Sequence, residues 1–118
     1  MNISDFTRKY YADIYSALSS IDHNAFNKVV LLIEKAKKKS GKIILIGNGG
    51  SAAIASHLAV DFTKAANIRA INFNEGSLLT CFSNDYGYEK WIEKAVKYYG
   101  NKKDVLIAIS SSGESKNI

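Results

Sequence analysis

IILIGNGGS, residues 43–51, is the stretch that decides the fold. Its first four residues, Ile43 to Ile46, form an unbroken aliphatic run, which is typical of a parallel strand buried on both faces. The three glycines that follow, with Ser51 behind them, predict a tight turn from this strand into a helix. Strand, turn and helix in this order indicate one unit of a parallel α/β sheet.

Two helices precede this unit, and further helices and strands follow it. Before it, apolar residues at steps of three and four predict two amphipathic helices, the second ending near Gly41 as a C-cap. After it, the expected elements are a helix over 52–62, a strand over 69–74, a short helix over 78–82, a helix over 91–99 that ends at Gly100, and a strand over 105–109.

These elements predict one α/β domain over residues 1–118, built on a parallel, doubly wound sheet with helices on both faces. Three strands leave an exposed sheet edge, so we expect a domain that is incomplete at its C-terminus or covered by something else. The helices within residues 1–40 carry a long apolar stripe for so small a domain. We expect this stripe to pack against other copies of the chain. Its members are Phe6, Tyr10, Ile14 and Leu18.

Charge and composition narrow the function classes. The net charge is +5, and a lysine run falls where the second helix ends, which favours a solvated helix end over a nucleic-acid site. The run consists of Lys35, Lys37, Lys38, Lys39 and Lys42. A basic protein attracts acidic substrates such as sugar phosphates.

The sequence has no membrane-length apolar run and no signal-peptide core, so we expect a cytoplasmic protein without membrane partners. The single cysteine, Cys81, is expected to be a buried small hydrophobe.

Two loops, each following a buried strand, are candidate anion sites. The loops at 47–51 and 110–115 join strand ends to helix starts, where ligands of open α/β sheets bind. Neither contains the Gly-Lys-Ser/Thr of a P-loop. The first also fits the loose dinucleotide pattern G-x-G-x-x-G/A, for which Glu75 would be a distant acidic partner. A purely structural turn remains a third interpretation.

Two further pairs could carry chemistry. His57 and Asp61 are four apart and share one helix face, where they could bind one metal ion or transfer a proton. A lone histidine on a helix is, however, more often structural. Asn84 and Asp85 could bind sugar hydroxyls, or could form an Asx turn or the N-cap of the helix that contains Trp91.

Taken together, four motifs resemble the phosphoheptose isomerases, which contain a sugar-isomerase (SIS) domain with a flavodoxin-like sheet. The motifs are GNGGS at 47–51, His57 followed by Asp61, SNDYG at 83–87 and ISSSGES at 109–115. Their order and spacing match along essentially the whole chain. The residues that match substrate-binding positions are Asn48, Gly49, Gly50, Ser51, Asn84, Asp85 and, in the phosphate loop, Ser110, Ser111, Ser112 and Ser115.

The resemblance implies an aldose–ketose isomerase in carbohydrate metabolism. It would convert sedoheptulose 7-phosphate to D-glycero-D-manno-heptose 7-phosphate, for the heptose of lipopolysaccharide or capsule. It also implies a homotetramer and zinc, with His57 as a ligand. Asp61 stands where the family has a glutamate that is both zinc ligand and catalytic base. The family's second half supplies a further histidine and a glutamine. Two alternatives stay open: a non-catalytic SIS module that binds sugar phosphates or proteins, and a dinucleotide-binding module.

Overall fold

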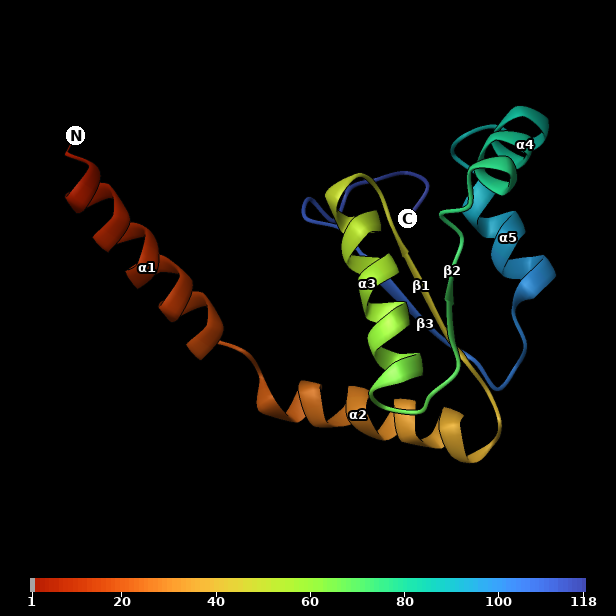
Figure 1. The fold of residues 1–118 in the computed structure, drawn as a ribbon, viewed down its shortest axis with the longest axis horizontal. Helices are drawn as coiled ribbons and strands as arrows, with labels where there is room; N and C mark the ends of the chain where they lie inside the picture. Colours follow the sequence, from red (N-terminus) through yellow and green to blue (C-terminus); the bar gives the residue numbers. More distant parts are fainter. Residues whose placement is uncertain (1) are drawn as a thin grey trace. The chain divides into compact units, whose positions relative to one another are not determined.

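The computed structural model describes residues 2–118 and divides into two compact units, one up to Leu31 and one from Leu32 to Ile118 (Figure 1). The elements are α1 (Ile3–Ser19), α2 (His23–Lys38), β1 (Ile43–Gly47), α3 (Gly50–Lys64), β2 (Ala70–Asn72), α4 (Gly76–Tyr86), α5 (Trp91–Tyr99) and β3 (Val105–Ile109). The boundary between the units falls within α2. Within residues 2–118, no helix is both long and apolar enough to cross a membrane.

The first unit consists of α1 and the start of α2, as the apolar spacing predicts. The Asn2 side chain caps α1 by accepting a hydrogen bond from the Ser4 amide at 3.1 Å. None of the described residues of α1 is buried. Its predicted apolar stripe is exposed in the single chain, and Phe6 and Tyr10 stack with ring centroids 6.1 Å apart.

The second unit is built on a parallel sheet of order β2-β1-β3, which confirms the predicted fold class. Ile43 of β1 is in register with Ala70 of β2 and with Val105 of β3. All of β1 is buried, as its aliphatic run predicts. β3 is an edge strand of this sheet, and its residues alternate between half-buried and exposed.

Successive side chains of β1 enter two different cores, because side chains alternate across a strand. Ile43 and Leu45 pack with α3 on one face, whereas Ile44 and Ile46 pack with α5 on the other. In Figure 1, α3 and the α4–α5 pair accordingly flank the sheet from opposite sides. The buried partners are Ala36, Ala55, Ala59 and Ile68 in the first core and Phe73, Trp91, Ile92 and Ala95 in the second. The sheet is therefore doubly wound.

One local prediction was wrong, and another was right only in part. Cys81 is exposed, because the phase of α4 turns Leu78, Leu79 and Phe82 toward the second core and leaves Cys81 on the outer side. At the end of α2 the left-handed residue is Ser40, with φ 55°, and not the predicted Gly41, although the Gly41 amide does cap the helix by donating to the Ala36 carbonyl at 2.8 Å.

Gly41 is needed for another reason. A Cβ there would lie 2.1 Å from the Lys103 carbonyl oxygen, so glycine lets the turn before β3 approach closely.

The expectation of a solvated helix end fits Lys35, Lys37 and Lys38 in the last turn of α2. It is wrong for Lys42, whose ammonium group forms a partly buried ion pair with Asp104.

Candidate functional site

The loop after β1 is shaped by glycine. A Cβ on Gly47 would lie 2.7 Å from the backbone of Ser51, so only glycine lets β1 turn this tightly into α3. Gly49 has φ 54° and ψ −122°, a conformation that side chains other than hydrogen strongly disfavour. The Ser51 amide donates to the Asn48 carbonyl at 3.0 Å. The amides of Ala52 and Ala53 likewise donate to the carbonyls of Asn48 and Gly49, at 3.3 and 3.2 Å. The turn therefore directs the positive end of the α3 dipole at the loop, which favours an anion there.

The serine-rich loop after β3 holds its own shape through its hydroxyls. The Gly113 amide donates to Ser110 Oγ at 3.0 Å, and the Glu114 amide donates to Ser112 Oγ at 3.2 Å. Gly113 permits the turn with φ 69°. Because the Ser110 hydroxyl is used here as an acceptor, its proton stays free to donate to a ligand.

The two loops meet at the carboxyl edge of the sheet. Gly47 and Ile109 are paired in the parallel register of β1 and β3, so both loops leave the sheet side by side. A cavity of about 90 Å³ lies between them. Its lining residues are Asn48, Ser51, Ile109, Ser110, Ser111 and Ser115. The structure therefore brings five predicted site residues together, with hydroxyls and a helix N-terminus around one small cavity.

Asn48 is fixed by two residues that the sequence analysis did not identify. Asn48 and Asn117 exchange two amide hydrogen bonds, at 2.8 and 2.9 Å, and the Tyr88 hydroxyl donates to Asn48 Oδ1 at 3.3 Å. Asn117 is only 8% exposed. Its pairing with Asn48 spans 69 residues, so no local motif in the sequence identifies it. Asn117 thereby ties the serine loop to the glycine loop.

His57 and Asp61 form a pair of their own on α3. His57 Nε2 lies 3.5 Å from Asp61 Oδ2, and their side chains are 80% and 55% exposed. Neither residue lines the cavity between the loops. Asp61 lies eleven residues after Gly50, which is roughly 16 Å along a helix of 1.5 Å rise per residue. Asp61 is therefore separated from the phosphate-type cavity by most of the length of α3, and His57 by about half of it.

The pair offers two donors of the types that zinc binds, an imidazole nitrogen and a carboxylate oxygen. A structural or catalytic zinc site needs three or four protein ligands. Among residues 2–118 there is no group of three histidine, cysteine or acidic side chains arranged to hold a metal ion. His57 and Asp61 therefore fit half of a zinc site, and any further ligands would lie outside the described residues.

Asn84 and Asp85 lie in the last turn of α4, so the predicted alternatives of an Asx turn or an N-cap were both wrong. Lys90 occupies the N-cap position of α5 instead, without a side-chain hydrogen bond to the helix. The Asn84 amide donates to Asp85 Oδ1 at 3.0 Å, and the Cys81 thiol donates to Asp85 Oδ2 at 3.6 Å. The Asp85 charge, followed by partial burial and this hydrogen bond, raises the pKa of the Cys81 thiol. Neither residue lines the cavity, although Tyr88 shortly after them reaches Asn48.

Glu75, the acidic partner in the dinucleotide interpretation, caps α4. Its two carboxylate oxygens accept hydrogen bonds from the amides of Ser77 at 2.9 Å and Leu78 at 2.8 Å. These backbone bonds hold the pKa of Glu75 below its ordinary value. The carboxylate that would bind a ribose is thus engaged in capping a helix.

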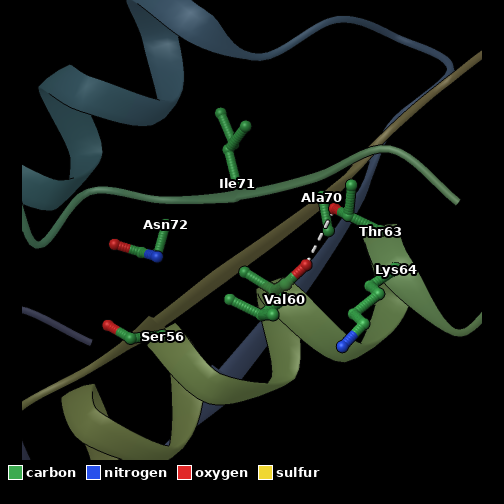
Figure 2. Close-up of a pocket in the computed structure, with 8 residues that line it drawn as sticks. Ser56, Val60, Thr63, Lys64, Ala70, Ile71 and Asn72 are labelled. Atoms are coloured by element: carbon green, nitrogen blue, oxygen red, sulfur yellow. Dashed lines mark hydrogen bonds between the residues drawn. The ribbon is translucent and has the colours of Figure 1, made fainter.

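A larger cavity, of about 350 Å³, lies between α3 and β2 (Figure 2). Its walls are mainly apolar, with Val60, Ala70 and Ile71 among them, and the Ser56 hydroxyl already accepts a hydrogen bond from Asn74 at 2.8 Å. No predicted site residue lines it. A further cavity of about 330 Å³ has Asp61 in an otherwise apolar lining. The small cavity between the loops is the candidate site because it gathers several predicted site residues.

Comparison with known proteins gives one consistent result. The SIS domain family matches residues 8–118. The chain is 43% identical to the phosphoheptose isomerase of Helicobacter pylori strain P12, across 86% of this chain and 56% of that protein. It is 35% identical to the phosphoheptose isomerase of Thermodesulfovibrio yellowstonii, across 100% of this chain and 63% of that protein.

Solved structures agree with the sequence relatives. The phosphoheptose isomerase from Neisseria gonorrhoeae superposes with a TM-score of 0.88 at 32% identity, over 98% of this chain and 65% of that one. The chain thus spans between about half and two thirds of the length of the relatives that it matches.

Proposed function

The chain belongs to the SIS domain family, and on that premise we propose that the protein is an aldose–ketose isomerase for a sugar phosphate. The observation that carries the proposal is the cavity where the glycine and serine loops meet at the carboxyl edge of the sheet. The favoured substrate is sedoheptulose 7-phosphate, because the relatives that match most of this chain are named phosphoheptose isomerases. Its product would be D-glycero-D-manno-heptose 7-phosphate.

The substrate's phosphate would bind between the loops. Ser110, Ser111 and Ser115 supply hydroxyls, and the start of α3 supplies the positive end of its dipole. Asn48, oriented by Asn117, would hydrogen-bond the sugar. Binding the phosphate away from the reacting carbons supplies energy for positioning the sugar.

The proton transfer would take place at the other end of the sugar. The phosphate is on carbon 7 and the reacting carbons are 1 and 2, so such a substrate requires a base away from the phosphate loop. Asp61, well along α3, suits that position. Its carboxylate would take a proton from one carbon and return it to the neighbouring carbon through an enediol. His57, 3.5 Å from Asp61, would hold the carboxylate in place.

Zinc is part of this proposal through His57 and Asp61. Bound there, the ion would act as a Lewis acid that stabilises the developing oxyanion. The same two side chains can orient and exchange a proton without it, since a histidine and a carboxylate are a common acid–base pair. Metal analysis of the purified full-length protein, with His57→Ala as the comparison, tests the zinc assignment directly.

A homo-oligomer, with a tetramer as the favoured form, is the second part of the proposal. On α1, the exposed fractions are 52% for Phe6, 53% for Tyr10, 40% for Ile14 and 62% for Leu18. A contiguous apolar stripe of this kind on a helix normally packs against a partner. Light scattering should give a dimer or tetramer at micromolar concentration, and a well-folded monomer would contradict it. We propose the cytoplasm as the location.

One alternative has an observation in its favour. Asp61 and His57 do not line the cavity, so the cavity could bind a sugar phosphate without catalysis. Turnover of sedoheptulose 7-phosphate by the full-length protein separates the two functions. An isomerase should turn the substrate over, and Ser111→Ala should weaken its binding. Binding without turnover would support the non-catalytic module, and unchanged affinity in both Ser111→Ala and Ser115→Ala would remove the phosphate assignment.

A further inference from the structure

The positive charge of the chain is concentrated at the amino edge of the sheet, opposite the loops of the candidate site. Two cavities of about 210 and 470 Å³ lie there and share the turn from Lys102 to Asp104. We call them together the basic cavity. Its charged lining residues are Lys35, Lys39, Lys42, Arg69, Lys102, Lys103 and Asp104.

The charge of this lining equals that of the whole chain. Six cationic side chains and one carboxylate give +5 at the basic cavity. The sequence has 16 lysines and arginines and 11 acidic residues, which also gives +5. The other residues of the chain therefore carry no net charge, and the whole excess lies around two cavities that share the turn from Lys102 to Asp104. The low-dielectric walls of such cavities strengthen the field of these charges.

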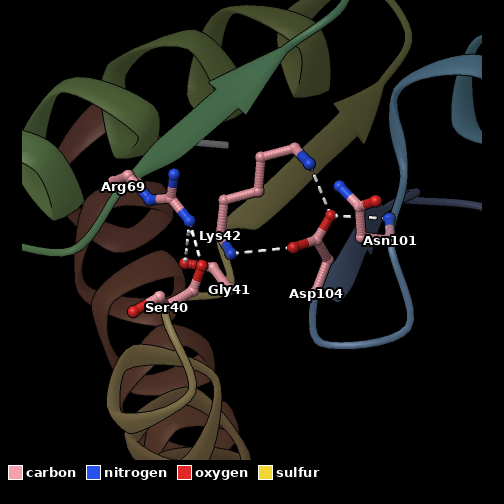
Figure 3. A network of polar contacts seen from close by, with 6 residues as sticks. All are labelled: Ser40, Gly41, Lys42, Arg69, Asn101 and Asp104. Carbon is pink, nitrogen blue, oxygen red and sulfur yellow. Dashed lines mark hydrogen bonds and ion pairs between the residues drawn. The ribbon is translucent and has the colours of Figure 1, made fainter.

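The single carboxylate of the basic cavity is already paired (Figure 3). Asp104 Oδ1 accepts from the Lys42 amide at 2.9 Å, and Oδ2 accepts from Lys42 Nζ at 2.5 Å and from the Asn101 amide at 2.8 Å. The Asp104 side chain is only 7% exposed. Asp104 thus neutralises Lys42 and fixes the turn, and leaves the other cations without a counter-charge from this carboxylate.

The remaining cations are available to a ligand. Arg69 uses one guanidinium nitrogen to donate to the carbonyls of Ser40 and Gly41, which holds the side chain at the cavity. Its other donors make no recorded bond within residues 2–118. Lys102 and Lys103 are exposed, and in the described part of the chain neither belongs to an ion pair.

We propose that the basic cavity binds a compact anion with two linked phosphates, at a site separate from the sugar-phosphate site. Several ammonium groups and one anchored guanidinium around a concave surface suit a multiply charged phosphate group. The lining contains no aromatic side chain, whereas single-stranded nucleic acid is held by base stacking on aromatic residues. The diphosphate could be inorganic pyrophosphate or the diphosphate of a nucleotide.

Titration calorimetry of the full-length protein at low salt, with inorganic pyrophosphate as the probe, tests this proposal. The variant is Lys102→Gln with Lys103→Gln, and the matched control is Lys28→Gln with Lys97→Gln, which removes the same charge outside the basic cavity. Pyrophosphate should bind about tenfold more weakly or worse to the first variant, because bonds to charged donors dominate such binding. The control and Ser111→Ala should stay within about twofold of the parent, a difference of under half a kcal/mol.

Three results would overturn the proposal. The first is that the parent does not bind pyrophosphate. The second is that the lysine variant and its control lose equal affinity for pyrophosphate. The third is that Ser111→Ala loses as much affinity as the lysine variant. ADP as a second probe identifies the source, since tighter binding of ADP than of pyrophosphate indicates a nucleotide. Turnover of the sugar phosphate should be unchanged in the lysine variant, so failure here is distinct from failure of the proposed isomerase.

Discussion

Replacing Asp104 by asparagine should destabilise the second unit by about 2–3 kcal/mol, because it breaks a partly buried ion pair and leaves an N–H donor without its acceptor. The carboxylate accepts three hydrogen bonds, two at Oδ2 and one at Oδ1, and all three donors are N–H groups. An asparagine side chain has one acceptor oxygen and one NH₂ group. In either orientation its NH₂ group would face an N–H donor of Lys42 or Asn101. Asparagine therefore fills the space of Asp104 but cannot satisfy its partners.

Urea denaturation at neutral pH, followed by far-UV circular dichroism, measures the effect. With a denaturant slope of about 1–3 kcal/mol per M, the midpoint for Asp104→Asn should fall by about 1 M or more. Glu89→Gln is the matched control, since its ion pair with Lys116 spans 3.2 Å between side chains that are 65% and 79% exposed. Exposed pairs of this kind contribute about 0–1 kcal/mol.

The pH dependence provides a second readout. Burial of Asp104 raises the pKa of its carboxyl, but hydrogen bonds from Lys42 and Asn101 and the Lys42 charge outweigh burial and hold that pKa below its ordinary value. A carboxyl with a lowered pKa in the folded state stabilises the fold above its unfolded pKa of about 3.9. The contribution is lost as the pH falls through the folded value. The stability gap between the parent and Asp104→Asn should therefore narrow below about pH 4. An equal midpoint for both proteins at pH 7, or a gap that persists in acid, would refute this reasoning.

Three further substitutions or modifications test other parts of the structure. Gly41→Ala should cost about 2–3 kcal/mol in the same denaturation experiment, because its Cβ would lie 2.1 Å from the Lys103 carbonyl oxygen; a stable variant would show that the turn can move. Asn117→Ala should weaken sugar-phosphate binding about tenfold by releasing Asn48, and unchanged affinity would show that Asn48 needs no such support. Cys81 should react with iodoacetamide in the folded protein, but more slowly at neutral pH than a free thiol and faster as the pH rises, since its pKa is raised; protection until unfolding would contradict its exposure.

The sheet and the two loops could be predicted because their signals are local. An aliphatic run followed by glycines, or by serines and a glycine, specifies a buried strand and a tight turn without reference to the rest of the chain. The parallel topology then brings the ends of β1 and β3 to one edge, so the meeting of Asn48 with Ser110, Ser111 and Ser115 follows from the fold class.

The structural features that could not be predicted from the sequence depend on contacts between distant segments. The pairing of Asn48 with Asn117 joins residues 69 apart, and the ion pair of Lys42 with Asp104 joins residues 62 apart. The lysine run was predicted as one solvated helix end, but the basic cavity combines three of its members with Arg69 and the turn before β3. These three are Lys35, Lys39 and Lys42. The exposure of Cys81 depends on the phase of α4, which a short apolar run does not fix.

The central claim, that Asp61 transfers the proton in a sugar-phosphate isomerase, is tested most directly by solvent exchange of the substrate's carbon-bound proton. The full-length parent should exchange the proton of sedoheptulose 7-phosphate in D₂O, and Asp61→Asn should exchange it about 10²–10⁴-fold more slowly while still binding the sugar phosphate. Metal content measured in the same samples separates loss of the base from loss of zinc. Asp61→Glu shows whether the site is built around aspartate, in which case exchange falls, or around the family's glutamate, in which case exchange rises. Full exchange by Asp61→Asn would contradict the account and leave the non-catalytic binding module as the better description.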